Sequence, residues 1–368
     1  MRSGMPGIAM LAAALGLAAG CGRTEPIVSC EAAGPSRPVC GFQNPEDFSV
    51  LPGRSQVIVS EFGSLDGARP GRLSLYDVES DARTLLYEGG SGEPASGWGA
   101  EDCPGPPTAA FSPHGIYLGA RKDRSLQLLA VNHGGRESIE YFEVNRDEDP
   151  VQLTWRGCVV APPSSRLNDV AGMWRGGFVT THMYEGDASG FSLAVAALLG
   201  RPTGYVLQWT PTEGWAKLAG TEGSFPNGII TSASGSEIYV GYWMDNVVRR
   251  IERETGKELA RVAVEHPDNI NWGLNGRLLV ASQHGSLLQL RSCQDLERGV
   301  CALPFSIVAL DPPLELKPAL LFSSEGAPMG AGSAAVSVQN DLVIGTFAGD
   351  RLLRFERPKR PFAPHSAD

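Results

Sequence analysis

The sequence of 368 residues has no long amphipathic heptad run and no surplus of positive charge. Its net charge is −10, from 31 Lys and Arg against 41 Asp and Glu, and both signs are mixed along the chain. Because a nucleic-acid surface needs a basic patch, nucleic acid is not an expected partner. The 45 Gly and 27 Pro favour short strands joined by many turns over helices.

No two of the seven cysteines have C-x-x-C spacing, which disfavours a zinc site built from them. Once Cys21 is set aside as part of a signal, six cysteines remain, and an even set is typical of disulfides formed in an oxidising compartment. Neighbours along the chain suggest Cys30–Cys40 and Cys293–Cys301, which leaves Cys103–Cys158. Six cysteines allow many other pairings, so the sequence leaves the pairing open.

No apolar run is long enough for a permanent membrane-spanning helix, but the first residues are typical of export. Arg2 precedes an apolar stretch over 8–19, and small residues stand just before Cys21. This pattern predicts a bacterial lipoprotein signal over 1–20, with lipidation of Cys21; an ordinary secretory signal is the alternative. No Asp follows Cys21, which favours a lipid-anchored position on the periplasmic face of the outer membrane.

One unit recurs six times: a short apolar strand, a loop and a second strand. First strands are expected at 57–62, 115–120, 176–181, 237–242, 277–282 and 342–347. Second strands are expected at 72–78, 126–132, 204–209, 247–252, 287–292 and 351–356. Six units without a linker predict an all-β, six-bladed β-propeller over 45–357, and two β-sandwiches are the alternative. A tether over 21–44 and a tail over 358–368 would flank it.

The largest insertion within a unit lies between Glu185 and Thr203. It contains the apolar run FSLAVAALLG over 191–200, which predicts a short helix. That helix either forms a lid over a pocket or packs on the face of the propeller.

Polar residues recur at the same position ahead of the six first strands. They are Glu46 and Asp47, His114, Asn168 and Asp169, Asn227, Asp268 and Asn269, and Ser333. Each alone is typical of a turn, but equivalent positions in a propeller meet at one mouth of the central channel, so these side chains are expected to converge. Carboxylate and amide oxygens suit Ca²⁺, whereas the absence of thiolates and the scarcity of imidazoles disfavour zinc.

Several of these residues stand in ordered motifs, namely PEDF, FSPHGI, AVNH, RLNDV, PNGI, PDNI, ASQHG and GSAAVSVQNDLVIGT. In these motifs, from about Pro45 to Glu356, the chain resembles the paraoxonase and arylesterase family of calcium-dependent lactonases, within the wider gluconolactonase-like propellers. The resemblance implies two calcium ions and a histidine dyad. The ligands implied for the catalytic ion are Glu46, Asn168, Asn227, Asp268 and Asn269. Those for a structural ion are Asp47, Asp169 and the main-chain carbonyl of Ile116, and the dyad is His114 and His133.

The resemblance implies hydrolysis of lactones or aryl esters, with a small-molecule substrate. Calcium would polarise the carbonyl and stabilise the oxyanion that forms on attack. His114 would deprotonate a water molecule, and His133 would orient His114 and share its proton.

The chain departs from the family at one point near the expected pocket. Paraoxonases carry Asn-Asp-His where this sequence has His182-Met183-Tyr184, which leaves the substrate open. Further residues are secondary candidates for the pocket: His182, His284, which matches a family histidine near the mouth, and the aromatic residues Phe225, Trp174 and Trp209.

Two other readings of the chain stay open. A non-enzymatic propeller, stabilised by calcium and tethered to the membrane, would bind a partner or ligand, since one fold hosts many functions. A lyase-like propeller related to strictosidine synthase is the other reading, although those proteins lack this set of calcium ligands.

Overall fold

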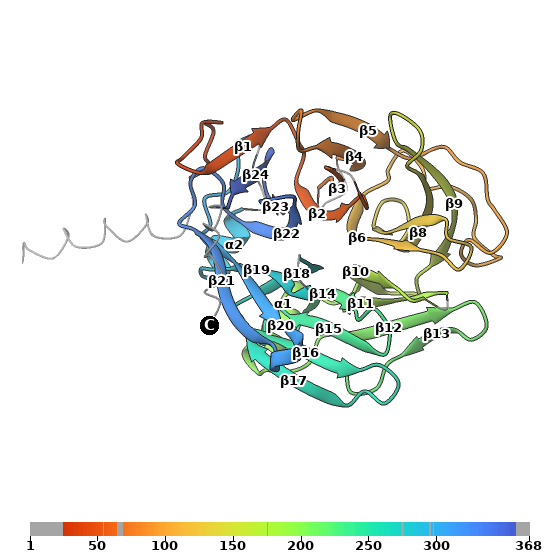
Figure 1. Ribbon diagram of the computed structural model, residues 1–368. Coiled ribbons are helices and arrows are strands. Elements are labelled where there is room, and N and C mark those ends of the chain that lie inside the picture. The colour runs from red at the N-terminus through yellow and green to blue at the C-terminus, as the bar shows by residue number, and fades with distance from the viewer. Residues whose placement is uncertain are drawn as a thin grey trace, which may run out of the picture.

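Six four-stranded antiparallel sheets are arranged around a central channel like the blades of a wheel (Figure 1). The computed structural model describes residues 25–357 except 54, 65–68, 175, 274–275, 294–295 and 297. The six-bladed β-propeller expected from the repeats is confirmed. The predicted signal peptide, the predicted lipidation site Cys21 and the tail over 358–368 lie outside the described residues. Within the described ranges, no helix has the length and hydrophobicity needed to cross a membrane.

The strands of the first five blades follow one another along the chain. Blade 1 contains β2 (Pro45–Val50), β3 (Gln56–Glu61), β4 (Arg72–Asp77) and β5 (Arg83–Tyr87). Blade 2 contains β6 (Pro113–Ala120), β7 (Leu126–Asn132), β8 (Ser138–Asn145) and β9 (Gln152–Val160). Blade 3 contains β10 (Ser165–Gly172), β11 (Phe178–Glu185), β12 (Tyr205–Thr210) and β13 (Gly214–Lys217). Blade 4 contains β14 (Pro226–Thr231), β15 (Glu237–Tyr242), β16 (Val247–Glu252) and β17 (Glu258–Ala263). Blade 5 contains β18 (Pro267–Trp272), β19 (Leu278–Gln283), β20 (Phe305–Asp311) and β21 (Lys317–Ser324).

The sixth blade joins the two ends of the chain. It contains β22 (Gly332–Val338), β23 (Asp341–Thr346) and β24 (Arg351–Glu356), and its outer strand is β1 (Ser36–Cys40). The propeller therefore begins at Ser36 rather than at residue 45, and part of the expected tether is a strand. β1 covers the edge of β24, which would otherwise expose unpaired main-chain groups. The buried Arg351 also donates to the main-chain carbonyls of Ile27 and Ser29.

The apolar core lies between neighbouring blades. Ile58 of blade 1 and Leu128 of blade 2 belong to one buried cluster, and Val59 of blade 1 and Val343 of blade 6 belong to another. Apolar side chains on both faces of the second strands explain why those strands dominate the sequence pattern.

The innermost strands are β2, β6, β10, β14, β18 and β22, and most of the expected first strands are instead second strands. The polar residues thus lie inside the innermost strands, near their beginnings, and not in loops ahead of them. Each innermost strand breaks register with its neighbour at this point, for example between Pro45 and Asp47 and between Pro267 and Ile270. Such bulges turn side chains away from the alternation of a regular strand.

Glycine allows the innermost strands to approach one another closely at the bulges. A Cβ on Gly115 would lie 2.3 Å from Oδ1 of Asp169 and 2.5 Å from its Cα. A Cβ on Gly228 would lie 2.5 Å from the carbonyl oxygen of Asp268. Larger residues here would push the innermost strands apart.

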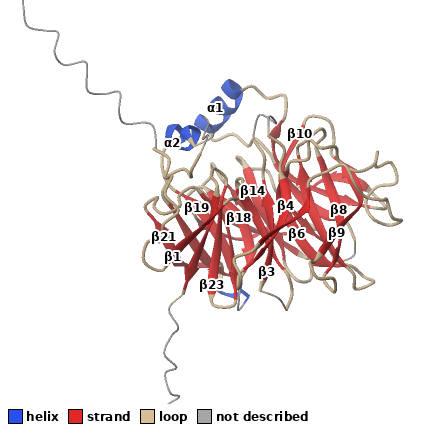
Figure 2. Ribbon diagram, turned by 90° about the horizontal axis from the view of Figure 1, so that it is seen from above, coloured by secondary structure: helices blue, strands red, loops and turns tan. Residues whose placement is uncertain are grey.

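Two α-helices lie over the same face of the propeller (Figure 2). The predicted helix of the insertion is present as α1 (Gly190–Leu198), capped by the Ser189 side chain, which accepts from Ser192 N. α1 has no fully buried residue, and Phe191 is 80% exposed, although Leu193 and Val195 are partly buried. A short 3-10 turn, η2 (Pro312–Leu314), follows β20.

The strand expected at 287–292 is wrong, because this segment forms α2 (Leu287–Ser292). Ser286 and Gln289 form a reciprocal cap: Ser286 N donates to Oε1 of Gln289 at 2.9 Å, and Gln289 N donates to Oγ of Ser286 at 3.4 Å. The third strand of blade 5 is β20 instead.

The three suggested cysteine pairs are disulfides in the structure: Cys30–Cys40, Cys103–Cys158 and Cys293–Cys301. The first ties the segment before β1 to the end of that strand. The second joins the loop after blade 1 to β9, and the third closes the loop after α2.

Candidate active site and metal centre

The innermost strands bring the predicted ligands of the catalytic calcium together from four blades. Glu46, Asn168, Asn227 and Asp268 line one cavity of about 200 Å³ and are all buried. Asn269 completes the set, because its Nδ2 donates to Oε1 of Glu46 at 2.7 Å across 223 residues of sequence. Five polar side chains from distant segments therefore meet at one mouth of the channel.

Four oxygen atoms of this set are buried and have no hydrogen-bond partner among the described residues: Glu46 Oε2, Asn168 Oδ1, Asn227 Oδ1 and Asn269 Oδ1. Buried polar atoms are almost always paired, because an unpaired one loses its hydration without compensation. A hard cation that prefers oxygen ligands would satisfy all four, so the donor set fits Ca²⁺. The described residues contain no metal-binding group of three or more His, Cys, Asp or Glu, and asparagines are three of the five residues here.

Buried negative charge is concentrated at this mouth. Burial, and then the charge of Glu46, raise the pKa of Asp47 to about 7. Burial and Glu46 also raise the pKa of Asp268 well above its usual range, and burial and Asp47 do the same for Asp169. Among the described residues, His114 is the only basic side chain within ion-pair distance of these four carboxylates, with Nε2 3.6 Å from Oε1 of Glu46. A divalent cation would offset this charge.

The residues predicted for the structural calcium also lie together, but they already have protein partners. Oδ2 of Asp47 accepts from Ile116 N at 2.8 Å, and Oδ2 of Asp169 accepts from Ile229 N at 2.7 Å. Each carboxylate thus links its blade to the next through a main-chain N–H. Their Oδ1 atoms also accept, from Nδ2 of Asn271 and from Val170 N, so this set has fewer unpaired oxygens than the first.

The two predicted dyad histidines are in contact beside these oxygen donors. Nδ1 of His114 lies 2.9 Å from Nε2 of His133, and Phe62 packs on the His114 ring with the two centroids 4.9 Å apart. Both histidines line a cavity of about 620 Å³ that shares residues, including Asn168 and Asn227, with the smaller cavity. Burial lowers the pKa of His133. Burial also opposes the charging of His114, but the carboxylates of Glu46, Asp47 and Glu137 together outweigh burial and raise the pKa of His114.

A family model described as Arylesterase matches residues 42–353. The chain belongs to the arylesterase family. The family resemblance predicted from the sequence motifs is therefore confirmed.

Solved structures of six-bladed propellers resemble this arylesterase-family chain in fold. A gluconolactonase from Xanthomonas campestris superposes with a TM-score of 0.51 at 16% identity, covering 92% of this chain and 98% of that one. A luciferin-regenerating enzyme gives a TM-score of 0.51 at 10% identity, covering 86% of this chain and 92% of that one. At such identities the likeness shows the fold alone. No curated protein matches the sequence.

The secondary pocket candidates of this arylesterase-family protein separate into two groups. Phe225 lines the larger cavity. His182 does not line either cavity: it is buried in β11 and stacks on Tyr205 with the two ring centroids 4.6 Å apart. Its neighbours Met183 and Tyr184 line the larger cavity instead. Of the segment His182-Met183-Tyr184, which differs from the paraoxonases, only Met183 and Tyr184 therefore face the candidate site.

His284 is also outside the cavity. Its Nδ1 lies 2.9 Å from Oε2 of Glu265, and its Nε2 lies 3.0 Å from Oγ of Ser306. The preceding residue, Gln283, occupies the cavity wall and donates from Nε2 to Oδ2 of Asp268. Trp243 fixes this amide by donating to its Oε1 at 3.1 Å.

The two tryptophans proposed for the pocket, Trp174 and Trp209, line neither of the two cavities. Trp209 is buried in blade 3, stacked on Phe178 with their ring centroids 5.7 Å apart. Trp174 follows the far end of β10, away from Asn168, and is 61% exposed. The sequence analysis missed Phe62, Trp243 and Gln283 as cavity residues. Phe62 and Trp243 follow strand ends outside the polar motifs, whereas Gln283 stands in the ASQHG motif, where His284 is the predicted candidate.

Proposed function

We propose that this protein is a calcium-dependent hydrolase of carboxylic esters, with lactones and aryl esters as its substrate classes. The observation that carries the proposal is the group of four unpaired oxygens next to a histidine pair, in adjoining cavities at one mouth of the channel. Membership of the arylesterase family supports it. The gluconolactonase among the similar folds is compatible with a cyclic ester as substrate.

Glu46, Asn168, Asn227, Asp268 and Asn269 would hold the calcium ion. When bound, calcium acts as a Lewis acid toward a carbonyl oxygen and stabilises the negative charge that develops there. Gln283 holds the Asp268 carboxylate in place, and Trp243 holds Gln283. This chain of contacts orients a charged ligand before any substrate arrives.

His114 is placed to act as the general base. Its Nδ1 is engaged by His133, so its Nε2 is the nitrogen directed toward Glu46 and the cavity. A water molecule in the cavity would lose its proton to this nitrogen as it attacks the ester carbon, and the carbonyl oxygen would become the oxyanion. The proton would then pass to the leaving alkoxide or phenoxide, which completes hydrolysis and restores the neutral imidazole.

The larger cavity suits a small apolar ester. Its volume of about 620 Å³ lies within the range of small-molecule sites. Its apolar wall includes Phe62, Met183, Tyr184, Phe225 and Trp243. Those side chains would pack against the acyl or aryl part of a substrate and keep bulk water from the reacting carbonyl.

The test is hydrolysis of a panel of aliphatic lactones and phenyl esters by purified protein, with calcium and with a chelator. We expect turnover only with calcium. We expect His114→Gln to lower kcat by about 100-fold or more, the usual contribution of a general base. His284→Gln is the matched control, because His284 lies outside both cavities. Protein that binds calcium but hydrolyses no member of the panel would contradict the proposal and favour the non-enzymatic binding propeller.

A further inference from the structure

A third residue extends the histidine pair away from the cavity. Glu137 lies in the turn between β7 and β8, four residues after His133. Nδ1 of His133 is 2.9 Å from its Oε2 and 3.1 Å from its Oε1. We propose that Glu137 is a positioning residue that fixes the tautomers of His133 and His114, so that Nε2 of His114 is the basic atom. This inference rests on the proposed function and deepens it.

The direction of the hydrogen bonds follows from the chemistry of a carboxylate. An ionised Glu137 only accepts, so Nδ1 of His133 must carry a proton. Nε2 of a neutral His133 is then an acceptor and receives the proton of His114 Nδ1 at 2.9 Å. Nε2 of His114 is left with its lone pair. The carboxylate thus sets the protonation of an imidazole that it does not touch.

Glu137 is itself held by the neighbouring blade. Its Oε1 accepts from Leu167 N at 2.6 Å, and Nη1 of Arg166 lies 3.3 Å from its Oε2. Leu167 directly precedes the candidate calcium ligand Asn168. One carboxylate therefore joins the dyad of blade 2 to the innermost strand of blade 3. The pKa of Glu137 is lowered, because its contacts with His133, Leu167 and Arg166 together outweigh the effect of burial.

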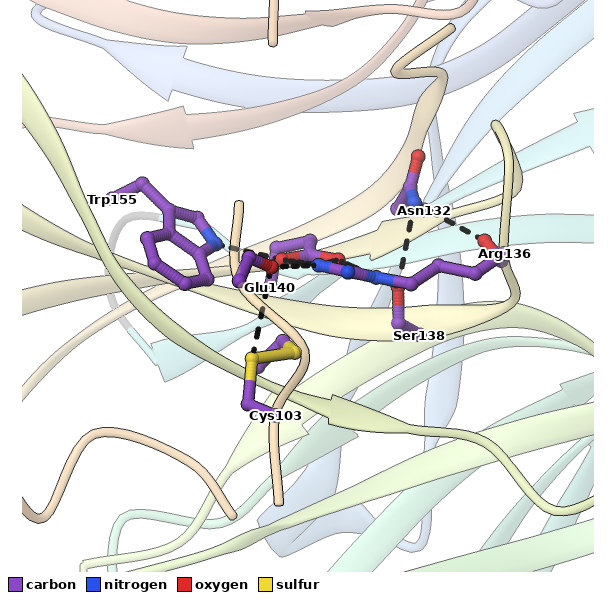
Figure 3. Close-up of a disulfide and its surroundings, with 8 residues drawn as sticks. Cys103, Asn132, Arg136, Ser138, Glu140 and Trp155 are labelled. Atoms are coloured by element: carbon purple, nitrogen blue, oxygen red, sulfur yellow. Dashed lines mark hydrogen bonds and ion pairs between the residues drawn. A yellow bond between two sulfur atoms is a disulfide. The ribbon is translucent and has the colours of Figure 1, made fainter. Parts of the chain in front are cut away.

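The turn that carries His133 and Glu137 is held rigidly at its base (Figure 3). Oδ1 of Asn132 accepts from Ser112 N at 3.0 Å, and its Nδ2 donates to the carbonyl of Arg136 at 3.1 Å. The Arg136 side chain is in turn held by Glu140 at 2.8 Å. These contacts fix both ends of the four-residue span, so the Glu137–His133 geometry is built in before substrate binds.

Replacing Glu137 by glutamine should invert this arrangement. The shortest contact of the carboxylate is with Leu167 N, a group that can only donate, so the amide oxygen must stay there. The amide nitrogen then takes the Oε2 position and donates to Nδ1 of His133. His133 would carry its proton on Nε2 and His114 would do the same, which removes the lone pair that faces the cavity. The same loss of the correct tautomer is known when an amide replaces the orienting carboxylate of a Ser-His-Asp triad.

The experiment compares three calcium-loaded proteins: the wild type, the Glu137→Gln variant and the Glu143→Gln variant. Each is measured by enzyme kinetics and by NMR. Glu143 is the matched control, a carboxylate on β8 paired with Arg156 at 2.8 Å and away from both cavities. In the kinetic readout we expect Glu137→Gln to lower kcat by about 10- to 100-fold, with KM unchanged, as for other residues that orient a functional group through a second one. We expect no change for Glu143→Gln. Wild-type kcat in Glu137→Gln would overturn the proposal.

The second readout needs no substrate. Nitrogen-15 NMR of histidine-labelled protein distinguishes the two imidazole tautomers. We expect His133 and His114 to be protonated at Nδ1 in the wild type and at Nε2 in Glu137→Gln. A wild-type His133 protonated at Nε2 would overturn the proposal. If no ester is hydrolysed but the tautomers behave as expected, the proposed function fails while the positioning role of Glu137 stands, so the two failures are distinguishable.

Discussion

Glu140 and Asp268 are both buried carboxylates on propeller strands, but their surroundings differ. Glu140 accepts from Arg136, from Oγ of Ser138 at 2.6 Å and from Nε1 of Trp155 at 2.7 Å (Figure 3). Asp268 accepts from the neutral amide of Gln283 and has the carboxylate of Glu46 nearby. Burial raises the pKa of both, but Arg136 opposes the rise at Glu140 whereas Glu46 adds to it at Asp268.

We propose that this difference separates a carboxylate that stabilises the fold from one that binds a metal ion. A buried charge is tolerated when the protein supplies an opposite charge and enough donors, as it does inside blade 2. At the channel mouth the described residues supply acceptors and almost no cationic partner, and in the proposed function a bound calcium ion supplies the compensating charge. Four predictions test this comparison.

The largest effect is expected inside blade 2. Glu140→Gln leaves Arg136 without its ion pair, and breaking a buried pair in this way costs about 3–5 kcal/mol. We expect the free energy of unfolding in urea to fall by that amount equally with calcium and with chelator. A loss under 1 kcal/mol, on the order of a surface ion pair, would show that Glu140 is not a structural carboxylate of the kind described.

Calcium itself should give an effect of similar size. A ligand that binds only the folded protein stabilises it by about 4 kcal/mol when its free concentration is 1,000 times Kd. We therefore expect a large increase in the midpoint of thermal unfolding on adding calcium to chelated protein, and a smaller one with magnesium, which prefers a tighter octahedral site. Superimposable unfolding curves with and without calcium would refute a calcium site at the channel mouth.

Asp268→Asn should move stability in the direction opposite to Glu140→Gln. In calcium-free protein it removes a buried carboxyl whose ionisation is opposed by burial and by Glu46, so the variant should be more stable than the wild type. It should also bind calcium more weakly. Chelator-treated variants compared by urea unfolding, and calcium titration by calorimetry, would measure the two effects. Destabilisation of the calcium-free protein would mean that Asp268 is held by the fold like Glu140.

The fold and the oxygen donors could be predicted because both depend on repetition. Apolar second strands such as 342–347 recur in every blade, and the polar residues keep a constant position relative to them. Their convergence required only that equivalent positions of a closed ring meet at its axis. The sequence did not reveal that Glu46 and Asp268 lie inside innermost strands, because bulges and polar side chains hide the alternation there.

The remaining differences depend on geometry that no local pattern specifies. Whether Gln283 or His284 faces the channel depends on the register of β19, and a slip by one residue reverses the choice. Glu137 contacts His133 within one turn, but its contact with Leu167 of another blade depends on the fold and is not visible in the sequence pattern. Segment 287–292 differs from these cases, because a local sequence pattern did specify its structure. Ser286 and Gln289 form a capping box, which marks the start of a helix, but the apolar residues of the segment suggested a strand.

The smallest effect concerns pH and follows from the pKa of Asp47, which burial and Glu46 raise from 3.8 to about 7 in the calcium-free protein. A carboxyl whose pKa is raised in the folded state contributes stability that is fully present below about pH 4 and is lost as pH rises to about 7. Calcium bound beside Asp47 would favour the ionised form of this carboxyl and displace its proton. The increase in unfolding midpoint caused by a fixed calcium concentration should therefore shrink steadily as pH is lowered from 8 to 5. If the calcium-induced rise in unfolding midpoint is constant over this range, the carboxylates at the channel mouth are already ionised without calcium. Asp268 and Glu140 would then differ only in their hydrogen-bond and ion-pair partners.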